Sequence, residues 1–276
     1  MTDPAATGEE PSQPPSAGTG PDWLILLRRL TEATPRWLSW KNVESALAGV
    51  GDIDSVAPRE DWDRVEMEFR RWAFEHGLGP VVVCPHAPFL LHLVALSSER
   101  PEFYELDVNR RKVFLGSTLF LPEDLLPLAI MDERGFRRLR PGAEGILKLV
   151  QNGMLRDGRP NLRGLASKGI PESLRQDPEG VGGGARLFGP AADAILRAAR
   201  ALMEGDWDRR ALLEMEGWFL ARAVTEPDSV RARIRFRINV RRCPVLSAVV
   251  LNRRRIGEEP ETWVRRVSQT HRVYTS

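Results

Sequence analysis

The sequence predicts an α/β (α+β) fold, with a mixed sheet and flanking helices in the first half and a mainly helical second half. Between Asp52 and Leu115, short apolar runs are separated by turn residues, which is typical of strands. Beyond Leu121, apolar residues recur at spacings of three and four, which indicates helices. The 276 residues suffice for one large domain or two small ones with a substantial core.

In the first half, helical spacing predicts helices over Trp23–Arg36 and Asp61–Glu75. Ser39 is positioned to cap a short helix over Val43–Ala48, which would stop at Gly49-Val50-Gly51. Strands are expected over Asp52–Val56, Val81–Cys84, Phe89–Leu96 and Phe103–Val108. A further strand over Lys112–Leu115 is expected to pair by a hairpin across Asn109-Arg110-Arg111.

In the second half, Pro171–Gly184 is expected to be a loop. It ends in Gly180-Val181-Gly182-Gly183-Gly184, which is no phosphate-binding P-loop because no Gly-Lys-Ser/Thr follows it, so we interpret it as a flexible connector. Helices are expected over Glu123–Met131, Ala143–Asn152, Asn161–Ser167, Ala191–Met203 and Asp208–Ala223. The stretch after Arg231 is ambiguous between strand and helix.

Composition indicates a globular protein of a reducing cytoplasmic compartment. Hydrophobic residues make up 42% and charged residues 28%, and no apolar run approaches the length of a membrane span. Cys84 and Cys243 give no disulfide framework. Residues 1–21 are rich in Pro, Gly, Ser and Thr and lack the apolar core of a signal peptide, so they are expected to be a disordered leader.

The charge is unevenly distributed, although the net charge is only +2. From Arg231 to Ser276 there are 12 Arg and 3 Glu, so the tail is strongly basic and the remainder is acidic. Within the tail, Arg231, Arg233, Arg235 and Arg237 alternate with apolar residues. As a strand, this stripe would either follow a nucleic-acid backbone or be a charged edge strand that resists aggregation.

Three acids are the leading candidates for a functional site. Asp52 and Asp54 are two residues apart on a predicted strand, so they point to the same side, roughly 7 Å apart along the backbone. Asp107 lies in a separate apolar run, where a buried charge needs a partner. Carboxylates gathered on one sheet face repel one another unless divalent cations neutralise them, as in a two-metal phosphoryl-transfer site.

The segment from about Trp37 to Phe114 resembles the polymerase-β-like nucleotidyltransferase superfamily, in particular an uncharacterised bacterial branch. The matching residues are Lys41-Asn42, Gly51-Asp52-Ile53-Asp54 and Leu106-Asp107-Val108. The family's usual Gly-Ser before the short helix is missing, and Trp40-Lys41-Asn42 stands in its place.

The resemblance implies a catalytic domain, which is expected over residues 22–121, and the helical spacing and the charge predict a mainly helical region with a basic tail over 122–276. Asp52 and Asp54 would ligate two Mg²⁺ ions, with Mn²⁺ as a substitute, and Asp107 would ligate the ion nearest the acceptor. A nucleoside triphosphate such as ATP would bind near Lys41, Asn42, Gly51 and Lys148. Lys148 shares a helix face with Gln151, and a polar helix edge is the alternative interpretation.

The sequence therefore leaves two classes of function open. The first is a Mg²⁺-dependent transferase that moves a nucleoside monophosphate onto a hydroxyl or phosphate acceptor. The acceptor would be a small molecule or cell-surface precursor, because no aromatic nucleic-acid platform is visible, with tRNA as a toxin-like variant. The second is a catalytically degenerate binding or regulatory module. A metal-dependent glycosyltransferase is disfavoured, because it does not require the third acid and the chain lacks its leading nucleotide-binding unit.

Two further groups of residues are candidates for a functional role. Cys84, His86 and His92 lie close together, but their spacing matches no zinc pattern, and His92 is interpreted as a sheet residue lining a pocket. His86 is a candidate for the acceptor pocket. Arg137, Arg138 and Arg140 form a loop that either binds phosphate or is a solvated basic turn.

Overall fold

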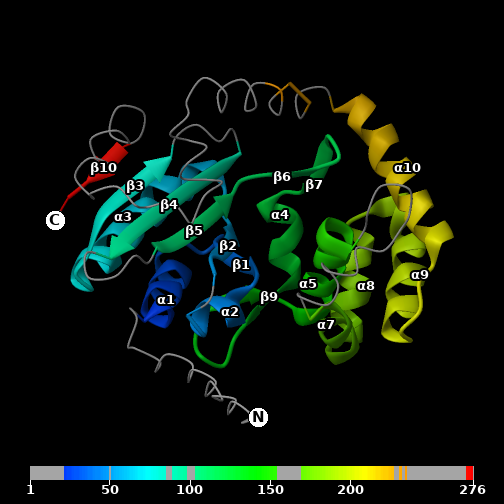
Figure 1. Ribbon diagram of the computed structural model, residues 1–276, viewed down its shortest axis with the longest axis horizontal. Coiled ribbons are helices and arrows are strands. Elements are labelled where there is room, and N and C mark those ends of the chain that lie inside the picture. Colours follow the sequence, from blue (N-terminus) through cyan, green and yellow to red (C-terminus); the bar gives the residue numbers. More distant parts are fainter. Residues whose placement is uncertain are drawn as a thin grey trace, which may run out of the picture.

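Strands from both halves of the chain form one mixed sheet. The computed structural model describes residues 22–49, 51–84, 89–97, 103–153, 169–226, 230, 231, 234 and 272–275. Within them, eight strands are arranged in the order β10-β3-β4-β5-β2-β1-β9-β8 (Figure 1). The pairs β2·β5 and β1·β9 are parallel, and the other neighbours are antiparallel. The predicted mixed α/β class is confirmed.

The bounds of the elements follow the chain order. The strands are β1 (Leu38–Lys41), β2 (Ile53–Val56), β3 (Leu78–Cys84), β4 (Leu90–Ser97), β5 (Phe103–Asn109), β6 (Lys112–Phe114), β7 (Ser117–Phe120), β8 (Ala129–Met131), β9 (Arg137–Leu139) and β10 (Arg272–Tyr274). The helices are α1 (Trp23–Ala33), α2 (Val43–Leu47), α3 (Trp62–Glu75), α4 (Pro122–Leu125), α5 (Pro141–Lys148), α7 (Ile170–Gln176), α8 (Pro178–Arg186), α9 (Ala192–Met203) and α10 (Arg209–Thr225). Short turns of 3-10 or π type are η1 (Arg59–Asp61), η2 (Leu126–Leu128), η3 (Leu149–Gly153) and η5 (Gly189–Ala191).

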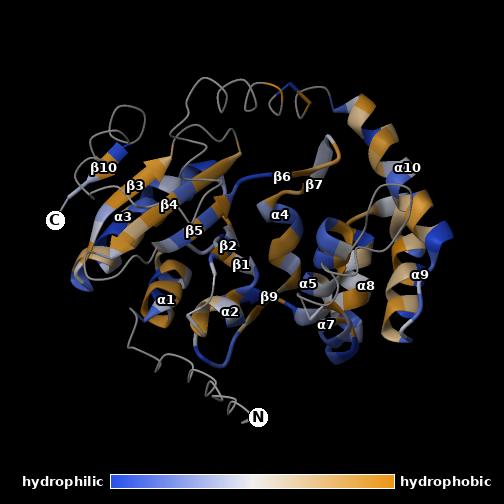
Figure 2. Ribbon diagram, in the orientation of Figure 1, coloured by the Kyte–Doolittle hydropathy of each residue, from blue (hydrophilic) through white to orange (hydrophobic). Residues whose placement is uncertain are grey.

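The two faces of the sheet belong to two hydrophobic cores. Ile53 and Leu106 pack with α1 and α3, whose apolar stripe is the one that the sequence predicts. Val56 packs with β1 and the helical half of the chain. Because side chains alternate along a strand, Ile53 and Val56 lie on opposite faces of β2. Figure 2 shows the apolar positions of the strands and of the helices around them.

The predicted cap at Ser39 is wrong. Ser39 lies inside β1, opposite Ser55 of β2, and Asn42 precedes α2 in a left-handed conformation with φ of 62°. The reason is that Trp37, Leu38 and Trp40 are all fully buried, so this segment is a strand covered on both faces.

The predicted hairpin between Lys112–Leu115 and the preceding strand is also wrong. Both edges of β5 are already occupied, by β2 and β4, so the chain leaves the sheet after Asn109. β6 instead pairs with β7 in a separate two-stranded sheet. The turn between them uses left-handed backbone at Leu115 (φ 48°) and Gly116 (φ 91°).

The predicted helix over Glu123–Met131 breaks into α4, η2 and β8. Pro127 lacks a backbone N–H and restricts the residue before it, so an α-helix cannot run through this position. β8 then pairs with β9 at the edge of the sheet. The helix predicted over Ala143–Asn152 begins earlier, at Pro141, and continues as the π-type turn η3 to Gly153.

The predicted loop over Pro171–Gly184 is helical, as α7 and α8. Asp177 caps α8 by accepting a hydrogen bond from the backbone N of Gly180 at 3.0 Å. A Cβ atom on Gly184 would lie 2.9 Å from the Cα of Ala143 in α5. The glycine run is therefore a surface for close helix packing and not a flexible connector.

The end of the basic tail forms one edge of the sheet, where β10 pairs with β3 (Figure 1). Arg272 and the hydroxyl of Tyr274 both contact the buried Glu66 of α3, at 2.6 and 2.9 Å. Of the alternating stripe, Arg231 and Ile234 are helical, while Arg233, Arg235 and Arg237 lie outside the described residues.

Other predictions fall on residues that are not described, namely the leader 1–21, the helix over Asn161–Ser167 and His86. None of the helices in the described ranges combines the length and apolar character needed to span a membrane.

Candidate metal site

The three predicted acids converge at the boundary between neighbouring strands. β2 and β5 pair in parallel, with Asp54 opposite Asp107 in the register, and Asp52 lies directly before β2. One carboxylate oxygen from each of the three lies within 4.8 Å of the others. Strand alternation predicts a common side for Asp52 and Asp54, and the parallel pairing of β2 with β5 brings Asp107 to the same place.

The turns around α2 bring Lys41 and Asn42 to the same carboxylate. The Nζ of Lys41 lies 3.3 Å from Oδ2 of Asp54, and the side-chain amide of Asn42 donates to the same oxygen at 3.1 Å. Gly51, directly before Asp52, has φ of 97°, a conformation that favours glycine, and a Cβ there would meet nothing within 4 Å. Lys41 and Asn42 therefore contact Asp54, and Gly51 directly precedes Asp52.

Burial raises the pKa of Asp54 to about 6. Asp54 is only 4% exposed, so its charged carboxylate has lost most of its hydration. The positive charge of Lys41 opposes this rise, and the nearby carboxylates of Asp107 and Asp52 add to it. This is the electrostatic situation in which a cation is bound with release of a proton.

His92 is the neighbour of Asp107 on β4 and was not among the residues predicted to form the site. Its Nδ1 lies 2.5 Å from Oδ1 of Asp107, so the ring nitrogen holds the proton that the carboxylate accepts. Burial would lower the pKa of His92, but the hydrogen bond and charge of Asp107 outweigh it and raise the pKa. Conversely, burial would raise the pKa of Asp107, but His92 outweighs it and lowers that pKa.

The Nε2 atom of His92 is buried without a hydrogen-bond partner. Cys84 is opposite His92 in the β3·β4 register. Among the described residues, however, the acid cluster alone brings three His, Cys, Asp or Glu side chains into metal-binding geometry. The zinc interpretation of Cys84 and His92 is therefore not supported in the described part of the chain.

Helix α5 contacts the segment that carries Lys41 and Asn42. Glu144 accepts a hydrogen bond from the backbone N of Asn42 at 3.2 Å and pairs with Lys148 at 2.5 Å. Lys148 is buried, and Glu144 links it to Asn42 beside the acids. Gln151, on the next turn, accepts a hydrogen bond from Nζ of Lys41 at 3.4 Å.

A second lysine, Lys112, lies near the acids and is not among the residues predicted for the site. The Nζ of Lys112 is 5.6 Å from the centre of the Trp40 ring, and that of Lys41 is 4.6 Å from the same ring. Burial and the charge of Lys41 lower the pKa of Lys112, while the nearby Asp54 and Asp107 oppose this. Sequence could not reveal this lysine, because it comes from β6, outside the main sheet.

The arginines of the predicted phosphate loop have partners inside the protein. Arg138 pairs with Glu44, Asp132 and Glu144, at 2.5, 3.3 and 3.4 Å. Arg140 pairs with Asp177 at 2.6 Å. The side chain of Arg137 donates to the backbone oxygen of Trp37 at 3.0 Å. These contacts fix β9 to its neighbours, which is a structural role.

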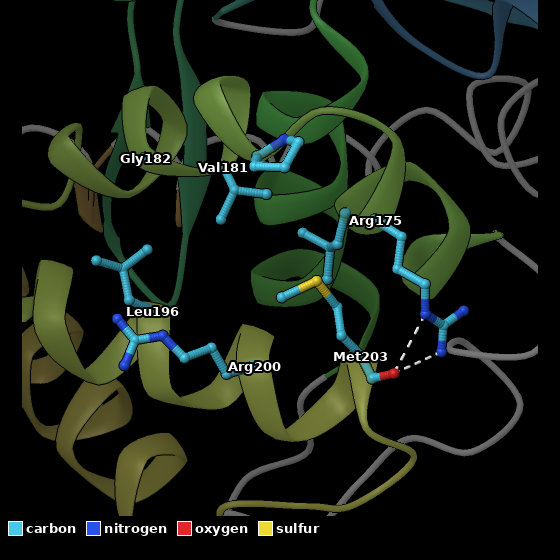
Figure 3. A pocket seen from close by; sticks show the side chains of 8 residues that line it. Arg175, Val181, Gly182, Leu196, Arg200 and Met203 are labelled. Atoms are coloured by element: carbon cyan, nitrogen blue, oxygen red, sulfur yellow. Dashed lines mark hydrogen bonds between the residues drawn. The ribbon is translucent and has the colours of Figure 1, made fainter.

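A cavity of about 430 Å³ lies elsewhere, among α7, α8 and α9 (Figure 3). Its lining is mainly apolar and includes Leu174, Val181 and Met203. Arg175 donates to the backbone oxygen of Met203, at 2.6 and 3.2 Å, so its guanidinium is held at the end of α9. None of the lining residues belongs to the acid cluster.

The donor set of the acid cluster fits a hard divalent cation. All three candidate ligands are carboxylates, and Mg²⁺ and Mn²⁺ prefer oxygen ligands, whereas zinc sites favour His and Cys. The group can therefore hold a metal ion. No protein-family model, curated protein or solved structure matches the chain, so its function has to be inferred from this geometry.

Proposed function

We propose that the protein is a Mg²⁺-dependent nucleotidyltransferase, which transfers a nucleoside monophosphate from a nucleoside triphosphate to a hydroxyl or phosphate acceptor. The observation that carries the proposal is the convergence of Asp52, Asp54 and Asp107 from two parallel-paired strands. The resemblance to the polymerase-β-like superfamily supports it, since that resemblance implies that these three acids ligate Mg²⁺. ATP is one suitable donor, and a cytoplasmic location follows from the need for nucleoside triphosphates.

The roles of the residues follow from their positions. Asp52 and Asp54 are suited to hold the cation beside the triphosphate, and Asp107 to hold it beside the acceptor. When bound, divalent cations lower the pKa of an attacking hydroxyl and offset charge on the leaving pyrophosphate. Lys41 and Asn42, which contact Asp54 here, are placed to donate to phosphate oxygens at the same position.

A second candidate is a catalytically degenerate module that binds a nucleotide or regulates a partner. The observation in its favour is that two of the acids already have partners within the chain. Asp54 contacts Lys41 and Asn42, and Asp107 contacts His92. The missing Gly-Ser, replaced here by Lys41-Asn42, points the same way.

Thermal unfolding with and without Mn²⁺ tests whether the protein binds the metal ion. We expect Mn²⁺ plus a nucleoside triphosphate to raise the melting temperature of the wild type and not that of Asp52→Asn/Asp54→Asn. Asp193→Asn, at the exposed start of α9, is the matched control and should behave as the wild type. Equal responses of wild type and double variant would exclude the acid cluster as the metal site.

Transfer is tested with α-phosphate-labelled nucleoside triphosphates and cell extract as the source of acceptor. We expect label to enter an acceptor with the wild type and the control, and not with Asp52→Asn/Asp54→Asn or Asp107→Asn. Metal-dependent nucleotide binding without any transfer would favour the degenerate module. Loss of the label on RNase treatment would identify RNA, such as tRNA, as the acceptor, whereas its persistence would indicate a small molecule or cell-surface precursor.

A further inference from the structure

The ends of β2 and β5 form a corner of the sheet from which three arginines emerge. The backbone N of Ala57 donates to the carbonyl of Asn109 at 3.2 Å, which ties the two strand ends together. Arg59 follows the end of β2, and Arg110 and Arg111 follow the end of β5. We call these three residues the arginine corner.

Aromatic rings support the guanidinium groups. Arg59 lies over the ring of Trp62, 4.5 Å from its centre. Arg110 and Arg111 lie over the single ring of Phe89, at 5.2 and 5.3 Å. The backbone N of Arg110 also donates to the carbonyl of Phe89 at 2.9 Å. These contacts hold the positively charged guanidinium groups over the faces of aromatic rings. Arg59 and Arg110 are nevertheless exposed to solvent.

The arginines affect one another electrostatically. Burial lowers the pKa of Arg110, and the positive charges of Arg111 and Arg59 lower it further. Like charges held together disfavour the protonated state, and an anion placed among them would relieve this repulsion. Arginine is also the side chain best suited to phosphate, because its planar fork donates two parallel hydrogen bonds.

A continuous run of cations leads from the corner to the acids. Lys112 directly follows Arg110 and Arg111, and it interacts electrostatically with Asp54 and Asp107. Along the chain, Arg110 is three residues beyond Asp107, which corresponds to about 10 Å in extended conformation. A molecule with one phosphate beside its reacting hydroxyl would not reach the corner. A nucleic-acid strand, with a phosphate every few ångströms, spans this distance.

Resting on the transferase function proposed above, we propose that the arginine corner binds the sugar–phosphate backbone of a single-stranded nucleic acid whose terminal hydroxyl is the acceptor. The sequence favoured a small acceptor because no aromatic platform for nucleic acid was visible. In the structure, arginines from two distant segments instead lie over aromatic rings, Arg59 over Trp62 and Arg110 and Arg111 over Phe89. Stacking on such rings and guanidinium planes is common in single-strand recognition.

The test measures binding of a fluorescent single-stranded RNA of about ten nucleotides to the full chain, with EDTA and without nucleotide. Arg59→Gln/Arg110→Gln is expected to weaken binding at least about tenfold at about 0.1 M salt. The slope of log Kd against log salt should fall by about 1.4, as expected for two lost phosphate contacts with a single strand. Arg209→Gln/Arg210→Gln, two exposed arginines at the start of α10, is the matched control and should bind as the wild type.

Equal loss of binding in both double variants would overturn the proposal, because the effect would then be one of net charge. Binding of inorganic tripolyphosphate without binding of RNA would overturn it as well, since the site would then serve free phosphates. The outcome is separable from that of the transferase proposal. RNA binding is measured in EDTA and without nucleotide, so it requires neither metal nor turnover. If label transfer fails while binding depends on Arg59 and Arg110, the arginine corner stands and the transferase proposal falls.

Discussion

Replacing Asp54 by Asn is expected to change how the stability of the metal-free protein depends on pH. The pKa of Asp54 is raised from 3.8 to about 6, mainly by burial, with Lys41 opposing and Asp107 adding to the rise. A pKa difference of this size corresponds to roughly 3 kcal/mol of unfolding free energy. A carboxyl whose pKa is higher in the folded state holds its proton more tightly there. Its stabilising effect is therefore complete below about pH 4 and is lost as the pH rises through about 6.

Asn cannot ionise, so the variant should not show this loss. We expect the unfolding free energy of Asp54→Asn, relative to the wild type, to increase by roughly 3 kcal/mol between pH 4 and pH 7. The sign is unusual for a polar residue with partners in the fold, because replacing the Asp54 carboxylate is expected to stabilise the metal-free protein at neutral pH. A buried acid that serves metal binding is expected to lower the unfolding free energy of the metal-free protein at neutral pH.

Urea unfolding followed by tryptophan fluorescence in EDTA, at several values between pH 4 and pH 7.5, gives the free energies. Asp193→Asn serves as the control, because it removes one carboxyl group that lies exposed at the start of α9, outside the acid cluster. If the wild-type and Asp54→Asn curves run parallel to within about 1 kcal/mol, the raised pKa of Asp54, and the reasoning from its burial, are refuted.

Three further predictions test the surroundings of the site and the packing of the helices. The imidazole of His92 should titrate by NMR with a midpoint above 6.5. Its stabilising effect, relative to His92→Gln, should be complete below pH 6.5 and be lost as the pH rises through that midpoint. A midpoint below 6.5 would contradict the pairing of His92 with Asp107. Gly142→Ala should lower the unfolding free energy by about 3 kcal/mol, because its Cβ would lie 2.0 Å from the carbonyl oxygen of Asp177. Gly217→Ala, which has open space around it, should raise the unfolding free energy by about 1 kcal/mol. Equal effects of the two variants in urea unfolding would contradict the close packing at Gly142. Asp177→Ala should cost about 2 kcal/mol, because this carboxylate accepts hydrogen bonds from two backbone N–H groups, and a change below about 0.5 kcal/mol would show that the cap contributes little.

Elements with a strong local period could be predicted from sequence, because local spacing determines them. α3 lies where its apolar spacing places it, and β2 and β5 lie where apolar residues with acids suggest short strands. The glycine run of α8 was misinterpreted for the converse reason. Glycine disfavours a helix locally, and only the close approach of α5 requires it there.

For the site, the sequence by itself determined the residue types and the common side of Asp52 and Asp54, because strand alternation is a local property. It could not determine which strands are neighbours. Only the tertiary structure brought Asp107 beside Asp54, since their parallel pairing joins residues far apart in the chain. The same holds for His92, which reaches Asp107 through the β4·β5 register, and for the arginine corner, where two strand ends meet. Such contacts depend on packing between distant segments, which the spacing of residues along the chain does not encode.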